Sequence, residues 1–229
     1  MQIYSAFNDD GVSVLVNDAE LDDAARTNAP LSTELADAAA QARRTDLIPQ
    51  VRASLDGDDR ARKLAAAKAL LALDDRSAGE LLETRATTET DTVVAKSFTA
   101  VAARLRGPES AMQLFEAPDT DPQLARLLVS NYNSHLRPEA GDVRFLIRAL
   151  HRYIDRSLPW LTTLTADLWD NGVFLMLNGL SNEHSVLLLR EQAAERATLA
   201  ALLARLDEYT DDDDILAEAR SLHAAMSAD

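Results

Sequence analysis

The chain has 229 residues, of which 47% are hydrophobic and 27% charged, a composition typical of a globular protein that can bury a sizeable core. Its seven glycines and seven prolines are fewer than strand-rich folds with many tight turns need, which disfavours an all-β architecture. The absence of cysteine excludes disulfides, thiolate nucleophiles and sulfur-ligated zinc. Because the sequence has no apolar run of about 18 residues and no apolar leader, we expect no membrane insertion and a cytoplasmic location.

The charge balance is strongly acidic. Lysine and arginine number 23 against 38 aspartates and glutamates, which gives a formal net charge of −15. A field of this sign repels nucleic acid, so we expect no nucleic-acid partner. Only three of the basic residues are lysines, and aspartates outnumber glutamates by 25 to 13. This bias resembles that of haloarchaeal proteins, whose carboxylate-rich surfaces stay hydrated in molar salt, and it predicts stability that rises with salt.

The N-terminal residues are predicted to form a β-hairpin. Ile3–Phe7 and Val12–Val16 are rich in residues that favour strands. Between them, Asn8–Gly11 suits a type I turn closed by a glycine in the left-handed region. A hairpin of this kind can add a strand to the sheet of a partner.

Helices are predicted to follow the hairpin and to complete an N-terminal segment over residues 1–45. Asn17 and Glu20 have the spacing of a capping box, which indicates that a helix begins there. A second helix is expected from Pro30 to about Arg44. All later signals are those of helices and turns.

Residues 46–138 contain a repeated two-helix unit. Its three copies span residues 46–73, 78–105 and 109–136. A lag of 32 residues relates Leu82, Leu114 and Leu146, and also Ala66 with Phe98, Ala69 with Val101, and Leu73 with Leu105. Asp59, Asp91 and Asp121 each stand where the second helix of a unit needs an N-cap. We predict three stacked antiparallel helix pairs that bury the three related leucines.

The second helix of the unit is similar to a known packing motif. The matching residues are Asp59, Arg62, Lys63, Ala66, Ala69, Leu70 and Leu73, then Asp121, Pro122, Leu124 and Leu128, and more loosely Asp91, Val94, Val101 and Leu105. They resemble the second helix of a HEAT-like repeat, and the short period looks most like the phycobilin-lyase subclass. Arg62 replaces the usual apolar residue, and Ala95 and Ala125 replace the basic one. The resemblance implies an all-α fold, a right-handed α-solenoid whose second helices line the inner face, and no particular activity.

Residues 139–229 are predicted to be degenerate repeats and a C-terminal helical cap, continuous with the rest in one domain. A helix is expected over residues 140–156. The apolar stretch after it should be interrupted by turns at Asn171, Gly172, Asn178 and Gly179. Within that stretch, Trp160, Trp169 and Phe174 are expected in the core.

Two more helices are expected at the C-terminal end. Asn182 can begin a long helix that includes the leucines from Leu187 to Leu206. The acidic run Asp211–Asp214 then precedes a last helix from Ile215 to about Met226.

No pattern in the sequence carries catalytic chemistry. The four histidines, His135, His151, His184 and His223, form no HExxH motif, and the glycines form no phosphate-binding loop. Asp56, Asp58 and Asp59 lack the alternating oxygen ligands and the late glutamate of a calcium loop. We therefore expect no catalytic, cofactor-binding or metal-binding residues, and we favour a protein that is not an enzyme.

Two groups of basic residues are candidate partner-binding surfaces. The groove cations are Lys63, Lys68, Lys96 and Arg126, expected on the inner face beside the small residues Ala67, Thr99, Ala100 and Ser130. The arginine stripe is Arg144, Arg148, Arg152 and Arg156, spaced four residues apart on one side of a helix. Either group could hold an acidic segment of a protein partner. Both are also explained as cations of a solvated face, with Asp155 and Glu139 beside the stripe.

Three functions are compatible with these features. The leading one is a non-catalytic scaffold or adaptor that binds another protein, because the repeats offer a surface and the chain lacks a catalytic pattern. The second is a lyase-like or chaperone-like protein that handles a cofactor, implied by the phycobilin-lyase resemblance. The third is a regulatory or signalling adaptor of a halophile that uses the hairpin to bind its partner.

Overall fold

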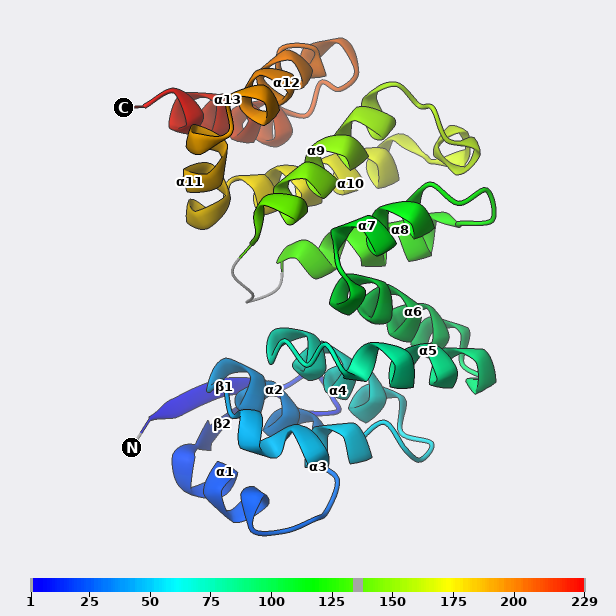
Figure 1. Ribbon diagram of the computed structural model, residues 1–229, viewed down its shortest axis with the longest axis vertical. Helices are drawn as coiled ribbons and strands as arrows, with labels where there is room; N and C mark the ends of the chain where they lie inside the picture. The colour runs from blue at the N-terminus through cyan, green and yellow to red at the C-terminus, as the bar shows by residue number, and fades with distance from the viewer. Residues whose placement is uncertain (1, 134–137, 229) are drawn as a thin grey trace. The chain divides into compact units, whose positions relative to one another are not determined.

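The computed structural model describes residues 2–133 and 138–228 (Figure 1). These residues form thirteen α-helices, four short 3-10 helices and one two-stranded antiparallel sheet, so the predicted helical character and the predicted hairpin are confirmed. They divide into two compact units on either side of the Arg106–Gly107 bond. His135 and the end of the third predicted repeat, at residue 136, lie outside the described residues.

The first unit contains the sheet and six helices (Figure 1). Its elements are β1 (Ile3–Phe7), β2 (Ser13–Asn17), α1 (Asp18–Ala25), α2 (Thr33–Gln41), α3 (Ile48–Ala53), α4 (Arg60–Ala72), α5 (Ala78–Thr88) and α6 (Thr92–Arg106). A 3-10 turn at Thr45–Leu47 leads into α3. The observed α2 is shorter than the predicted helix at both ends, since it begins at Thr33, three residues after the expected start at Pro30, and ends at Gln41, before Arg44.

The hairpin has the predicted turn and a register that fixes which side chains face the core. β1 pairs with β2 from Ile3 opposite Asn17 to Phe7 opposite Ser13. Gly11 closes the turn with a φ of +72°, a left-handed conformation that favours glycine. Tyr4, Ala6 and Val16 are buried on the face that packs against α2.

The predicted helix caps are confirmed. Asn17 and Glu20 form the capping box at the start of α1. Asp59 accepts a hydrogen bond from the Arg62 amide at the start of α4. Asp91 and Asp121 do the same for two amides each, at the starts of α6 and of α8 (Pro122–Ser130). Each aspartate satisfies amide groups that have no partner inside the helix.

The core of the first unit lies between α2, α4, α5 and α6. Helix α4 packs against both α2 and α6, and α5 packs along α6. The three residue pairs related by the 32-residue lag in this unit are all buried: Ala66 with Phe98, Ala69 with Val101, and Leu73 with Leu105. Leu82 of α5 is also fully buried, as predicted. Equivalent residues of the first two repeats therefore occupy the core in the same way.

The second unit contains seven helices (Figure 1). They are α7 (Pro108–Phe115), α8, α9 (Ala140–Ile154), α10 (Ala166–Leu180), α11 (Glu183–Glu191), α12 (Ala193–Leu203) and α13 (Asp213–Ser227). Three 3-10 helices connect them, at Asn131–Asn133, Pro159–Thr163 and Leu206–Glu208. Leu146 is buried as predicted, but Leu114 is only half-buried, because the neighbouring Phe115 takes the core position on α7.

An aromatic cluster forms the core where α7, α9 and α10 meet. The ring of Phe115 lies edge-on to that of Trp160, with centroids 5.3 Å apart, and Tyr153 contacts both. Trp169 extends the cluster, and its Nε1 donates to the Tyr153 carbonyl at 3.1 Å. Burial of Trp160 and Trp169 confirms their expected place in the core.

The predicted interruption of the apolar stretch is wrong, because α10 runs unbroken through all four proposed turn residues. Gly172 and Gly179 are both buried inside this helix. At Gly172 the missing side chain allows close packing against the ring of Tyr153. The prediction that Phe174 lies in the core is wrong, because its side chain is 41% exposed. It lies on the outer side of α10, whose inner side is occupied by Trp169 and Val173.

The long helix expected after Asn182 is two helices. Asn182 caps α11 as predicted, but Gln192 has a non-helical backbone and separates α11 from α12. The break leaves the Arg190 carbonyl outside the regular helical bonding, and Arg196 Nη1 donates to it at 2.7 Å. Asp212 then caps the last helix, α13, two residues earlier than expected.

Candidate functional site

Lys63, one of the groove cations, is part of an internal ion pair. Its Nζ lies 2.7 Å from Glu89 Oε2, and the two side chains are only 13% and 9% exposed. Glu89 also accepts hydrogen bonds from the amides of Thr90 and Asp91. The hydrogen bond from Lys63, followed by the one from the Asp91 amide, lowers the pKa of the Glu89 carboxyl. Lys63 therefore joins α4 to the turn between α5 and α6, and its charge is already compensated.

The other groove cations do not share one environment. Lys68 is exposed on α4, Lys96 is half-buried on α6, and Arg126 is exposed on α8 of the second unit. Ala67 and Ala100, expected to line an open groove, are fully buried because they pack into the helix core. The expectation that these two alanines border an open surface is wrong.

The arginine stripe lies on α9, and neighbouring carboxylates neutralise much of it. Arg148 and Arg152 both bind Glu116 at the end of α7, at 2.5 and 2.6 Å. Arg144 faces Glu195 of α12 at 3.9 Å. Arg156 lies beyond the end of α9, with a φ of +46°. The local positive surface is therefore smaller than the spacing of the arginines suggests.

The hairpin exposes an apolar face. Ile3, Phe7 and Leu15 point away from α2 and are 54%, 58% and 70% exposed, and Val12 beside the turn is 57% exposed. Between them, the hydroxyls of Ser5 and Ser13 are hydrogen-bonded across the strands. This group of exposed aliphatic and aromatic side chains makes the hairpin a candidate interaction surface.

The two outer edges of the hairpin differ. The Asn8 amide donates to the Val12 carbonyl, and the Asp18 amide donates to the Gln2 carbonyl, so the backbone groups of even-numbered residues bond between the two strands. The amides and carbonyls of odd-numbered residues therefore point away from the partner strand, toward the two outer edges. On β1, α2 covers this edge: Gln41 donates to the Ser5 carbonyl, and Asp37 accepts from the Phe7 amide. On β2, the outward amide and carbonyl groups of Ser13 and Leu15 have no partner among the described residues.

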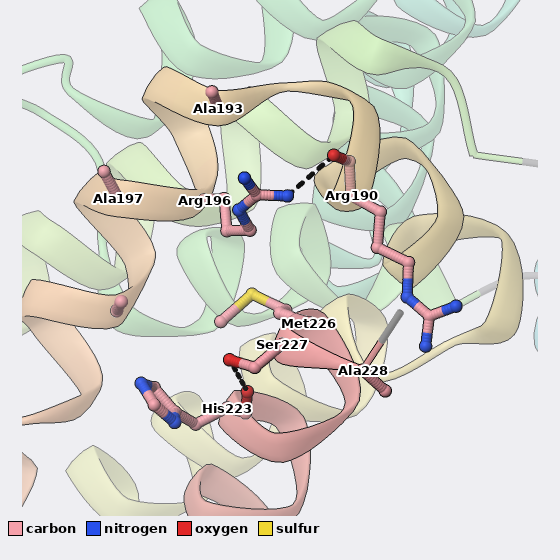
Figure 2. A pocket seen from close by; sticks show the side chains of 9 residues that line it. Arg190, Ala193, Arg196, Ala197, His223, Met226, Ser227 and Ala228 are labelled. Atoms are coloured by element: carbon pink, nitrogen blue, oxygen red, sulfur yellow. Dashed lines mark hydrogen bonds between the residues drawn. The ribbon is translucent and has the colours of Figure 1, made fainter.

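A second candidate site is a hollow of about 630 Å³ in the second unit, which we call the α12–α13 pocket (Figure 2). Arg190 at the end of α11, Arg196 of α12 and His223 of α13 line it, and the buried Met226 lies between them. Arg190 donates through Nε and Nη2 to the Ala225 carbonyl at 3.1 and 2.8 Å. No sequence pattern indicates this pocket, because its two arginines and its histidine come from three separate helices and match no motif.

Comparisons with family models, curated proteins and solved structures find no match to the chain. Among the described residues, no group of three or more histidines and carboxylates is placed to hold a metal ion. None of the described helices combines the length and the apolar character required to cross a lipid bilayer. The hairpin and the α12–α13 pocket are therefore considered on their geometry alone.

Proposed function

We propose that the protein is a non-catalytic scaffold that binds another protein through the open edge and exposed face of its N-terminal hairpin. The observation that carries the proposal combines backbone groups of Ser13 and Leu15 that have no partner within residues 2–133 and 138–228 with three large apolar side chains on one face. An added strand would satisfy those amides and carbonyls and would place its side chains beside Leu15. Exposed strand edges without protection are prone to pairing, so an edge of this kind is explained by a partner strand.

The charge around the hairpin defines the kind of partner strand that fits. Asp9 and Asp10 occupy the turn, Asp18 and Glu20 follow β2, and the whole chain has a net charge of −15. A complementary segment would alternate apolar residues, which cover the exposed face, with lysines or arginines. The groove cations and the stripe remain alternative surfaces for an acidic segment, although Lys63, Arg148 and Arg152 are already paired with carboxylates.

The helix pairs α3/α4, α5/α6 and α7/α8 form the proposed HEAT-like repeats. Support comes from the aspartate caps at the second helix of each pair and from equivalent buried residues on α4 and α6. In this interpretation the repeats belong to a right-handed α-solenoid, and the hairpin precedes the first repeat in the chain. A crystal structure in which the three pairs superpose on one another and are related by a right-handed rotation would test the repeat assignment.

The binding proposal is tested by purifying partners from the native host in high salt, identifying them by mass spectrometry and measuring their affinity for variants. Leu15→Pro removes an outward amide without breaking the ladder, and Phe7→Thr removes an apolar side chain from the exposed face. We expect each change to weaken partner binding by about tenfold or more, equivalent to about 1.4 kcal/mol. Leu187→Thr is the matched control, since Leu187 is 50% exposed on α11, in the other unit.

Two triple reversals separate the hairpin from the basic surfaces. One changes Lys68, Lys96 and Arg126 to glutamate, and the other changes Arg144, Arg148 and Arg152 to glutamate. Both alter the net charge equally, so a general field effect weakens binding by the same factor in each. If one triple reversal abolishes partner binding while Leu15→Pro and Phe7→Thr leave it unchanged, the hairpin proposal is wrong and that basic surface is the binding site.

A further inference from the structure

We infer that the α12–α13 pocket binds a phosphate group, carried by a small molecule or present as the free anion. The inference concerns the second unit only and is independent of the hairpin proposal. It rests on two guanidinium groups and one imidazole that border the same hollow in an acidic protein (Figure 2).

The two arginines differ from most arginines of the described residues in their partners. Arg44, Arg52, Arg148 and Arg152, among others, bind carboxylates that cancel their charge. Arg190 and Arg196 instead bind backbone carbonyls, those of Ala225 and of Arg190 itself, which carry no net charge. Within the described part of the chain neither guanidinium group is therefore paired with a carboxylate.

The same hydrogen bonds hold the two guanidinium groups in place. Arg190 uses Nε and Nη2 to bind Ala225, which leaves its Nη1 hydrogens available, and Arg196 uses only Nη1. A guanidinium whose orientation is already fixed loses little conformational entropy when it binds an oxyanion. The remaining N–H groups of the two side chains can donate to several oxygens of one ligand.

The nearest acidic residue on α12 does not occupy the pocket. Glu195 immediately precedes Arg196, but its carboxylate faces Arg144 of α9 at 3.9 Å. Ala193, the first residue of α12, also lines the hollow, so the positive end of a helix of eleven residues adds to the field there. Two fixed guanidinium groups, with this helix end and the hydrogen-bonding ring of His223 beside them, match a phosphate dianion better than a single carboxylate.

The pocket has room for more than the phosphate itself. Its volume of about 630 Å³ is open to solvent, and Met226 provides an apolar floor beside the polar groups. A phosphate monoester with a small organic group could therefore place its oxygens on the arginines and its carbon atoms over Met226. Free phosphate would make only the first of these contacts.

The test is isothermal titration calorimetry at constant ionic strength, in which the full chain is titrated with inorganic phosphate and, separately, with phenyl phosphate. We expect saturable binding of both, with the ester tighter than the free anion if the apolar floor is used and equal affinity if only the oxyanion is recognised. Arg190→Gln and Arg196→Gln should each weaken phosphate binding by about tenfold. The corresponding lysine variants keep the positive charge but lose the paired N–H donors of the planar guanidinium group. Their affinity for phosphate should therefore lie between those of the wild type and the glutamine variants.

Because both arginines also bind backbone carbonyls, each variant is checked by circular dichroism and by its unfolding midpoint without phosphate. A measurement on the wild type avoids the variants altogether: phosphate should move the NMR signals of the Arg190 and Arg196 side chains and of the His223 ring, while chloride at equal ionic strength should not. Absence of saturable heat together with unmoved signals, or glutamine variants that fold and bind phosphate like the wild type, would overturn the inference.

Discussion

Gly172 of α10 lies directly against the ring of Tyr153 of α9. A Cβ atom at position 172 would stand 2.4 Å from Tyr153 Cε1 and 2.6 Å from its hydroxyl oxygen, closer than atoms pack in proteins. The ring has little room to move, because Tyr153 is 2% exposed and contacts Phe115, Trp160 and Trp169. Burial also raises the pKa of the Tyr153 phenol, which therefore stays neutral across the physiological range.

This contact predicts that Gly172→Ala destabilises the second unit. Alanine in a helix interior gains about 1 kcal/mol over glycine. Forcing a methyl group into a packed aromatic cluster costs roughly 2 to 3 kcal/mol. We expect a net loss of about 1 to 2 kcal/mol in the free energy of unfolding, measured by urea denaturation with tryptophan fluorescence, because Trp160 and Trp169 report on this cluster.

Gly79→Ala is the matched control, and its predicted effect has the opposite sign. Gly79 is buried in α5, but a Cβ atom there would meet its nearest neighbour, the Ala102 carbonyl oxygen, at 3.6 Å, an ordinary contact. The substitution should therefore stabilise the first unit by about 0.5 kcal/mol. This is less than the full preference of a helix interior for alanine over glycine, because Gly79 is the second residue of α5. If both alanine variants change stability in the same direction, contact with Tyr153 does not decide the effect at Gly172.

The sequence predicts most of the helices because their signals are local. Asn17, Asp59, Asp91 and Asp121 cap helices as their spacing indicates, since a cap needs only amides two or three residues away. Gly172 shows where local reasoning fails. A glycine beside an asparagine indicates a turn, yet here it allows a helix to approach a ring that is distant in the sequence. Only the tertiary contact decides between the two interpretations.

Acid is predicted to destabilise the first unit through four carboxyls. Asp18, Asp46, Glu89 and Asp91 all have pKa values below the ordinary 3.8 of aspartate or 4.5 of glutamate, because each accepts hydrogen bonds from amides or from a basic side chain. Their folded pKa values lie below the unfolded ones, so their stabilisation is complete above the unfolded values. It is lost as the pH falls through the folded values. Urea midpoints measured from pH 7 to pH 3 should therefore fall below about pH 4.5.

Replacing Glu89 isolates one part of this pH dependence. Glu89→Gln removes the charge opposite Lys63 but keeps an oxygen that can accept from the Asp91 amide, so it should lower stability at pH 7 and make the acid-induced loss smaller. Glu80→Gln is the control, because Glu80 is an exposed glutamate of the neighbouring helix, α5. A pH dependence that is unchanged in Glu89→Gln would show that the Lys63–Glu89 pair does not contribute to it.

Three residues other than glycine hold a left-handed backbone just after a helix end. Arg43, Asp74 and Arg156 have φ values of +54°, +52° and +46°, and in each case the amide of this residue and the amide of the next one bond back to the last helical turn. At Arg156, glycine would remove the Cβ contact that makes this conformation costly, so Arg156→Gly should stabilise the second unit by about 1 kcal/mol. Arg156→Ala removes the same side chain and keeps the Cβ, so it should give no comparable gain in the thermal midpoint.

The candidate sites were less predictable than the fold, for a physical reason. The spacing of Arg144, Arg148 and Arg152 places them on one side of α9, but it says nothing of Glu116, a residue of the α7 end that binds two of them. Likewise, the composition of the α4 helix does not show that Lys63 is buried against Glu89. Charges are compensated by residues far away in the sequence, so a pattern of cations predicts a face and not whether that face is free to bind.

The last prediction concerns salt, and it separates charge repulsion from the general effect of salt on apolar burial. With a net charge of −15 and only three lysines, the folded chain should repel itself at low ionic strength, and its thermal midpoint should rise between 0.1 M and about 2 M KCl. Salt can also strengthen apolar burial, so the rise alone does not identify the cause.

A variant with fewer carboxylates separates the two causes. Four aspartates are exposed, and their carboxylates have no partner among the described residues: Asp10, Asp58, Asp119 and Asp211. Changing all four to asparagine brings the formal net charge from −15 to −11. If repulsion dominates, this variant should melt higher than the wild type in 0.1 M KCl and gain less from added salt. Equal gains in the two proteins would assign the effect to apolar burial and would remove the physical basis for comparing this composition with that of halophilic proteins.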